Sequence, residues 1–174
     1  MSVEALFKQA LGLAEPWVVT ECDFDAEAKK LVIKIDFERG ARFADPDSGE
    51  PCAVYDTRTR QWEHLKFFEH RTLLEARVPR ILGSDGKVRN VKVPWAEPNS
   101  GFTLLMEAFL LGLAKVLPVA EVSRQTGVSQ DRIWRLVRCR FDEALQEAFW
   151  SSLYRLGFAE TSTLNGHRYG TVFV

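Results

Sequence analysis

The sequence predicts an α+β fold: a small antiparallel β domain, then a helical domain with a helix-turn-helix, then a terminal β hairpin. Three changes of pattern lead to this prediction. Apolar and polar side chains alternate in several runs between residues 17 and 95, as in half-buried strands. From residue 102 the apolar side chains recur with a helical period, and residues 161–174 are strand-like again. We expect domains at residues 1–96, 97–148 and 149–174.

The predicted β domain begins with an amphipathic helix at residues 3–13 and contains two hairpins. The first hairpin pairs residues 17–24 with 31–37, where WVVTECDF and LVIKIDF alternate apolar and polar side chains. The second pairs residues 72–82 with 88–95, because Asp85 and Gly86 lie between two β-rich runs. Residues 94–101 are rich in Pro, Gly, Asn and Ser, and their composition predicts a hinge.

Residues 118–140 have the turn chemistry of a helix-turn-helix. Gly127 suits the left-handed position that closes a first helix, and Ser129 suits the N-cap of a second. An ordinary αα-hairpin in a helical core is the alternative interpretation. The positions expected to pack between the two helices are Val119, Val122, Thr126, Val128, Ile133 and Leu136.

Charge favours DNA as the partner of this segment. The whole chain has a net charge of −1, so DNA contacts require local clustering. Residues 118–140 contain five arginines against one Glu and one Asp, an excess of three cations. Trp134 could either contact DNA or pack against another part of the chain, and both interpretations stay open. Asp131 lies in the first turn of the second helix, so stabilising the positive end of the helix dipole is favoured over a contact with cytosine. The candidate DNA-binding residues are Arg124, Ser129, Gln130, Arg132, Trp134, Arg135 and Arg138.

Composition argues against several other classes of protein. A hydrophobic content of 46% supports a folded core. The cysteines at 22, 52 and 139 are sparse, which favours a reducing, cytoplasmic setting, and no secretory signal or membrane span is expected. Ser151, Ser152, His167 and Asp142 lack the turn motif of a nucleophile, and no cofactor is predicted. Arginines of the β domain are interleaved with acids, which indicates a solvated mixed-charge surface.

Several segments resemble, in the same order, the ISL-three family of bacterial insertion-sequence transposases. They are RGARF, VYDTRTRQWEHLKFFEHRTLLEARVPRI, VKVPWAEPNSGFTLLMEA, the helix-turn-helix and AETSTLNGHRYGTVFV. The resemblance extends from about residue 17 to residue 174. It implies an N-terminal zinc-ribbon-like domain, a helix-turn-helix that reads the terminal repeats of the element, and an RNase H-like core with metal-binding carboxylates.

The chain departs from the family at the zinc site. The four positions that match the family's zinc ligands carry Asp45, Ser48, Gly83 and Gly86. The remaining Cys22, Cys52, His64 and His70 form no close pairs, so we expect no metal. Asp, Ser, Pro and Gly also form tight turns, so the two loops are expected to keep their shape without metal. The side chains expected to stabilise this metal-free domain are Trp17, Phe37, Phe43, Trp62, Phe67, Phe68 and Trp95.

A second departure concerns catalysis. Ala159 stands where the family has its first catalytic Asp, and the adjacent Glu160 is expected on the opposite face of a strand. The chain also ends at Val174, before the family's other carboxylates. We therefore expect a catalytically incompetent, transposase-derived fragment that binds double-stranded DNA sequence-specifically. The alternative is an interaction protein that pairs with an intact transposase, or with itself, through residues 102–117 or the last strand. An active nuclease and a decayed remnant are further alternatives.

Overall fold

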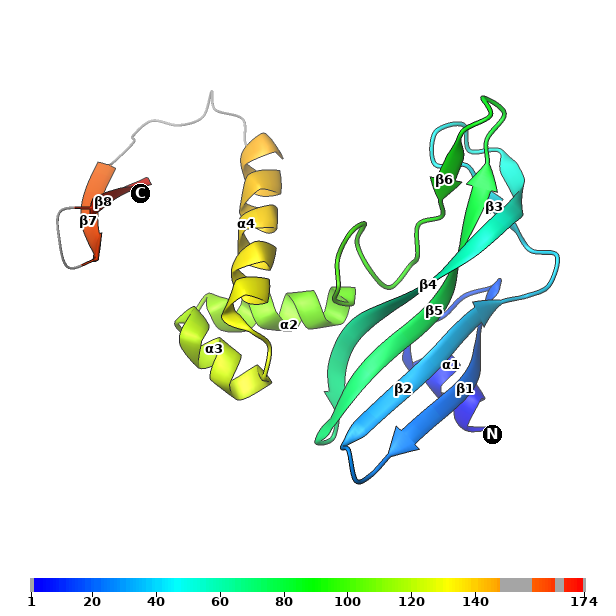
Figure 1. Cartoon of the computed structure of the whole chain (residues 1–174), viewed down its shortest axis with the longest axis horizontal. Helices are drawn as coiled ribbons and strands as arrows, with labels where there is room; N and C mark the ends of the chain where they lie inside the picture. The colour runs from blue at the N-terminus through cyan, green and yellow to red at the C-terminus, as the bar shows by residue number, and fades with distance from the viewer. Residues whose placement is uncertain (1, 148–157, 165–167, 174) are drawn as a thin grey trace. The chain divides into compact units, whose positions relative to one another are not determined.

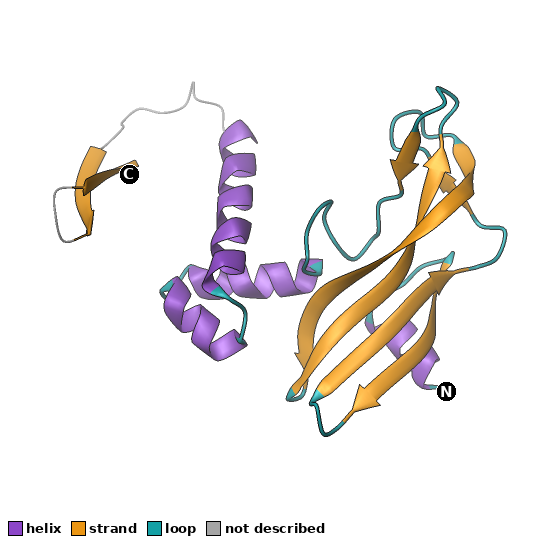
Figure 2. Ribbon diagram, viewed as in Figure 1, coloured by secondary structure: helices purple, strands orange, loops and turns teal. Residues whose placement is uncertain are grey.

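The computed structural model describes residues 2–147, 158–164 and 168–173, with side chains described for residues 2–142. The chain divides into two compact units, Met1–Val122 and Ser123–Val174. The first unit contains a β sheet and helices, and the second contains the longest helix of the described residues (Figures 1 and 2). The predicted α+β class is confirmed.

A six-stranded sheet dominates the first unit. Helix α1 (Val3–Ala10) precedes it and is shorter than predicted. The strands are β1 (Trp17–Asp25), β2 (Lys30–Phe37), β3 (Arg42–Ala44), β4 (Pro51–Phe67), β5 (His70–Leu82) and β6 (Val88–Asn90). Their order is β1-β2-β5-β4-β3, and β6 also pairs with β5 (Figure 1).

Both predicted hairpins are present, but the sheet around them differs from the prediction. β1 pairs antiparallel with β2, and β5 pairs antiparallel with β6, which ends at Asn90 instead of Trp95. β2 and β5 run parallel, so the prediction of an antiparallel domain is wrong at this pairing. The strand β4 was not predicted, although its 17 residues pair with β5 along most of their length.

A cluster of aromatic side chains lies within a core that is otherwise mainly aliphatic. Trp17 contacts the rings of Phe37, Phe43 and Trp95, and Trp95 also contacts Trp62 edge to face. Four of the seven predicted aromatic residues are buried, and Phe37 packs partly buried against them. Phe67 and Phe68 differ from the prediction: 83% of Phe68 is exposed, and Phe67, 40% exposed, contacts only the edge of the core through the ring of Phe7. They lie at the β4–β5 turn, beyond the aromatic cluster.

Residues 94–101, predicted as a hinge, are fixed to the sheet instead. Trp95 is buried against Trp17 and Trp62. Its carbonyl oxygen accepts a hydrogen bond of 2.8 Å from the backbone N–H of Leu104, at the start of the next helix. The composition of this segment indicated its lack of regular structure correctly, but burial of the indole holds it in place.

Three helices and a short hairpin follow. Helix α2 spans Leu104–Ala114, α3 spans Val119–Thr126 and α4 spans Gln130–Glu147 without a break at Phe141. Strands β7 (Phe158–Leu164) and β8 (Arg168–Phe173) pair antiparallel. Ser151, Ser152 and His167 lie outside the described residues. In the described part of the chain, no helix is both long enough and apolar enough to cross a membrane.

Candidate nucleic-acid interface

A left-handed glycine separates the two helices of the motif. Gly127 has a φ angle of +77°, and its N–H donates a 2.9 Å hydrogen bond to the carbonyl of Ser123. This bond from the residue after the helix to a carbonyl four positions earlier is a common helix C-cap. The carbonyl of Ser129 then accepts the first bonds of α4, from the N–H groups of Arg132 and Ile133. Both turn residues therefore have the positions that the sequence predicted.

The apolar side of the motif is buried as expected. Val122, Val128 and Ile133 are each at most 1% exposed, and Thr126 and Leu136 are below 9%. Val119 is half-buried. Val128 also donates a backbone hydrogen bond to the Thr126 hydroxyl. Burial of this set fixes which side of α4 faces away from solvent among the residues whose side chains are described.

The opposite side of α4 carries most of the predicted DNA-binding residues. Arg135 and Arg138 are exposed, as is 47% of Trp134, while Arg132 is half-buried. Within residues 2–142, whose side chains the structure describes, neither Arg135 nor Arg138 forms an ion pair. The remaining predicted residues are all exposed: Arg124, Ser129 and Gln130.

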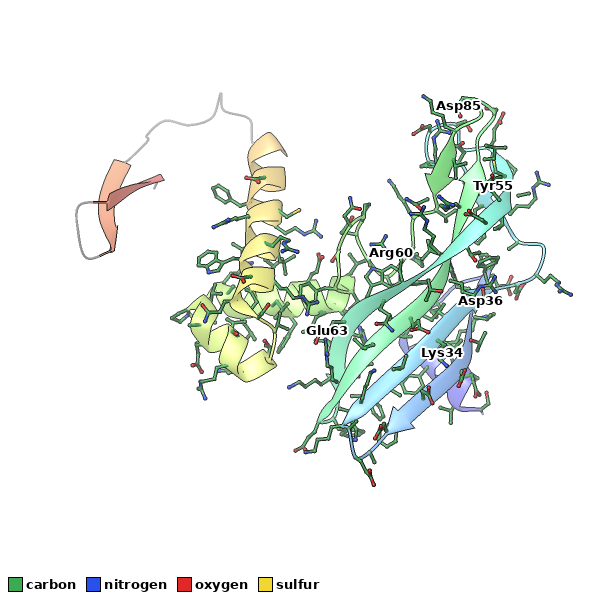
Figure 3. All side chains as sticks on the ribbon, in the orientation of Figure 1. Lys34, Asp36, Tyr55, Arg60, Glu63 and Asp85 are labelled. Carbon is green, nitrogen blue, oxygen red and sulfur yellow. The ribbon has the colours of Figure 1, made fainter. Side chains whose placement is uncertain are left out.

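Several arginines of the β sheet, in contrast, are paired with carboxylates. The Arg77 guanidinium lies 2.8 Å from the Asp36 carboxylate, and Arg71 lies 2.9 Å from Glu63. Arg80 binds Asp56 through two hydrogen bonds, which lower the pKa of that carboxyl. Asp36 and Glu63 are labelled in Figure 3. Since these three cations are already neutralised, they are poorer phosphate-binding groups than the exposed Arg135 and Arg138 of α4.

A polar junction attaches α2 to the sheet within the first unit. Glu63 of β4 accepts the N–H of Thr103 at 3.0 Å and donates its own N–H to Gly101 at 2.9 Å. The Thr103 hydroxyl caps α2 by accepting the N–H of Met106, and it lies 2.8 Å from Nδ1 of His64. Burial lowers the pKa of His64 below its ordinary value. Sequence patterns missed this junction, because β4 itself was not predicted.

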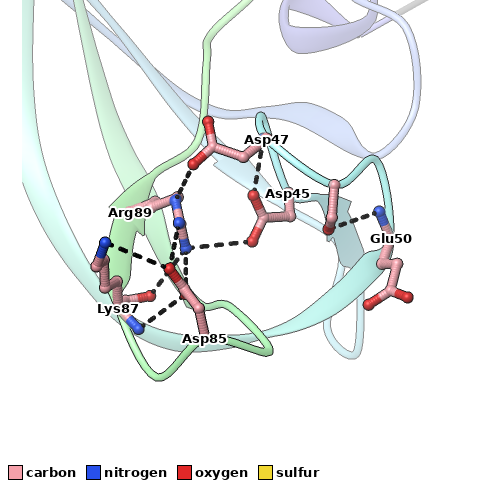
Figure 4. A network of polar contacts seen from close by, with 7 residues as sticks. Asp45, Asp47, Glu50, Asp85, Lys87 and Arg89 are labelled. Atoms are coloured by element: carbon pink, nitrogen blue, oxygen red, sulfur yellow. Dashed lines mark hydrogen bonds and ion pairs between the residues drawn. The ribbon is translucent and has the colours of Figure 1, made fainter.

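Local hydrogen bonds hold the two turns at residues 45–50 and 83–87, where the sequence resemblance implied zinc ligands. Asp45 accepts the N–H of Asp47, Ser48 accepts that of Glu50, and Asp85 accepts that of Lys87 (Figure 4). The donor set does not suit zinc, because the matching positions hold one carboxylate, one hydroxyl and two glycines. Within the described residues, no group of three or more His, Cys, Asp and Glu is arranged to hold a metal ion.

Comparison with known proteins identifies the helical segment. Residues 91–138 match the family model for the helix-turn-helix domain of transposase family ISL3. The match begins in the segment that packs on the sheet, includes α2 and α3, and ends at Arg138 of α4. No curated protein and no solved structure matches the chain. The segment is therefore similar to a transposase helix-turn-helix, and this similarity supports DNA binding.

Proposed function

We propose that this chain binds double-stranded DNA sequence-specifically by placing α4 in the major groove. The observation that carries the proposal is the exposed face of α4, where Arg135 and Arg138 lie one turn apart without ion-pair partners among residues 2–142. A guanidinium donates two parallel hydrogen bonds to guanine or to phosphate. The similarity to a transposase helix-turn-helix supports the same partner.

The terminal repeats of an insertion sequence are the target that the family resemblance implies. In this arrangement Arg135 and Arg138 read bases or hold phosphates, and Trp134 contacts a sugar or a thymine methyl group. Ser129 and Gln130 lie at the N-terminal end of α4, which is the end that contacts bases in this motif. Arg124 and Arg132 complete the proposed interface.

We propose also that the chain does not cleave DNA. Ala159 lies in β7 at the position where the resembling family has its first catalytic Asp. A methyl group cannot hold either of the two metal ions that phosphoryl transfer requires. A strand-cleavage assay with Mg²⁺ or Mn²⁺ tests this, and metal-dependent nicking by the purified chain would contradict it.

Fluorescence anisotropy with duplexes selected from a random pool tests DNA binding. If three to five phosphates are neutralised, log affinity falls against log salt with a slope of about −3 to −4.5. Arg135→Ala is expected to weaken binding to the selected site by about 5- to 150-fold, because a bidentate base contact contributes roughly 1–3 kcal/mol. Alanine is a strong helix former, so the change leaves α4 intact.

Arg77→Ala is the matched control, since Arg77 is exposed like Arg135 but paired with Asp36. It is expected to leave affinity unchanged. A flat salt response, or equal losses from the two alanine variants, contradicts the proposed interface. Equal weakening of Arg135→Ala on all duplexes assigns Arg135 to phosphate instead of a base.

Self-association is a second candidate function, supported by an apolar pair on α2. Leu105 and Phe109 are four residues apart and are 56% and 45% exposed. Such pairs lie on one face of a helix and can pack against a second chain. Sedimentation at several concentrations separates the two functions: a monomer that binds DNA supports the first, and an oligomer that ignores DNA supports the second.

A further inference from the structure

One arginine connects the two loops that match the family's zinc knuckles. Nε of Arg89 lies 2.7 Å from a carboxylate oxygen of Asp47, in the β3–β4 turn. Its two terminal nitrogens each lie 2.7 Å from an oxygen of Asp85, in the β5–β6 turn. Nη1 is also 3.5 Å from Asp45 (Figure 4). Three carboxylates from two turns thus converge on one guanidinium.

No other hydrogen bond described for this region joins the two turns. β3 pairs with β4, β6 pairs with β5, and β4 pairs with β5 from Val54 and Ile81 onward. The sheet therefore joins the strands that flank the turns, but its register does not include residues 45–50 or 83–87. Among the described residues 45–50 and 83–90, every hydrogen bond from one turn to the other comes from Arg89. The Arg89 guanidinium therefore lies where it can cross-link the β3–β4 turn to the β5–β6 turn.

The guanidinium is partly shielded from solvent, although two of its partners are not. The Arg89 side chain is 18% exposed and the Asp45 side chain 3%, whereas Asp47 is 70% and Asp85 40% exposed. The hydrogen bonds from Arg89 hold the pKa of Asp85 far below its usual range. Two parallel hydrogen bonds between guanidinium and carboxylate are among the strongest polar contacts in proteins.

A glycine opposite Arg89 leaves room for the guanidinium. A Cβ atom on Gly83 would lie 2.3 Å from Nη1 of Arg89 and 2.6 Å from an oxygen of Asp45. Any side chain at this position would therefore displace the arginine. Gly83 is also one of the four positions that match the family's metal ligands. A metal-binding side chain at residue 83 would extend into the space that the Arg89 guanidinium occupies here.

We propose that the Arg89 guanidinium takes the structural role of a bound metal ion and cross-links the two turns, so that this domain folds without metal. The guanidinium forms ion pairs and hydrogen bonds with Asp45, Asp47 and Asp85. The loss of cysteines at these turns is then compensated by an internal ion-pair network.

Thermal unfolding of the full chain tests this proposal, with and without EDTA and with metal content measured. EDTA is expected to leave the melting temperature unchanged. Arg89→Met is expected to lower it by about 10 °C, because it leaves converging carboxylates without their counter-charge. Arg77→Met is the matched control, since Arg77 forms its ion pair at a more exposed site, and a shift of at most about 2 °C is expected.

Gly83→Ala gives an independent test. It is expected to lower the melting temperature, whereas Gly112→Ala, with no atom within 4 Å of the new Cβ, is expected to leave it unchanged or raise it. The double variant Gly83→Ala/Arg89→Met is expected to unfold close to the temperature of Arg89→Met alone, since both changes remove the same cross-link.

If Arg89→Met does not fold, Arg89→Lys and the wild-type NMR spectrum decide the question. The Nε–H signal of Arg89, identified by its loss in Arg89→Lys, is expected to exchange with water more slowly than that of Arg77. Stoichiometric bound metal, a loss of stability in EDTA, additive effects in the double variant, or equal exchange of the two Nε–H groups each overturns the proposal.

Discussion

Thr103 is the side chain on which the attachment of α2 to the sheet most depends. It is 2% exposed, and its hydroxyl both caps α2 and contacts Nδ1 of the half-buried His64. Thr103→Val keeps the shape of the side chain and removes only the hydroxyl. The lost cap costs about 1 kcal/mol, and the shielded imidazole left unpaired costs about 2 kcal/mol more. We therefore expect the free energy of unfolding to fall by about 3 kcal/mol.

Urea unfolding followed by tryptophan fluorescence measures this loss, because Trp17, Trp62 and Trp95 are buried in the sheet. Thr103→Ser is the matched control, since it restores the hydroxyl and removes one methyl group, at a cost of about 1 kcal/mol. The reasoning is refuted if Thr103→Val stays within about 0.5 kcal/mol of wild type, or if Thr103→Ser is as damaging as Thr103→Val.

Two further predictions concern His64 and Gly127. Because burial lowers the pKa of His64, the unfolded chain binds the proton first, and stability should fall as pH drops from about 6.5 through the folded-state pKa. Urea unfolding between about pH 7 and pH 5 should show this slope, and His64→Gln should reduce it; an unchanged slope contradicts the assignment. Gly127→Ala places a side chain at φ +77° and should cost about 1 kcal/mol or more, whereas Gly127→Asn, better tolerated there, should cost less. Equal unfolding free energies for the two variants contradict strain at this turn.

The parts of the fold that the sequence predicted correctly depend on local signals. The β1–β2 hairpin follows from two alternating runs and a short polar turn, all within residues 17–37. The helix-turn-helix follows from Gly127 and Ser129 between two periodic segments. In each case residues close in sequence determine the structure, so contacts with distant residues did not alter the predicted element.

The parts that sequence patterns missed depend on distant partners. β4 is mostly half-buried or exposed, and only Trp62 and Glu63 of its residues are buried, so its apolar pattern is weak. β4 is a strand because it pairs with β5, and its own sequence does not predict this conformation. The parallel pairing of β2 with β5 joins Lys30 to Arg71, and no local pattern encodes such a register.

The interface was predicted as a set of residues, but the chemistry around it was not. Exposure agrees with the expectation for Gln130, Trp134, Arg135 and Arg138, because the helical period fixed which side of α4 is buried. The ion pairs of the sheet arginines could not be predicted from local sequence, since Arg77 and Asp36 are 41 residues apart. Only the folded chain shows which arginines are paired with a carboxylate and which have no such partner among residues 2–142.

This distinction separates the two possible DNA-binding surfaces. Arginines of the sheet such as Arg71, Arg77 and Arg80 must lose a carboxylate partner before they can bind a phosphate, and the partner left behind then repels the DNA backbone. Arg135 and Arg138 bear no such cost from any described residue, so each phosphate contact they make adds directly to affinity. A net charge of −1 is therefore compatible with DNA binding through a local cluster of cations on one helix. Removing these two charges should make the slope of log affinity against log salt less steep by about 2 if both contact phosphate, whereas removing the paired charge of Arg77 should leave the slope unchanged.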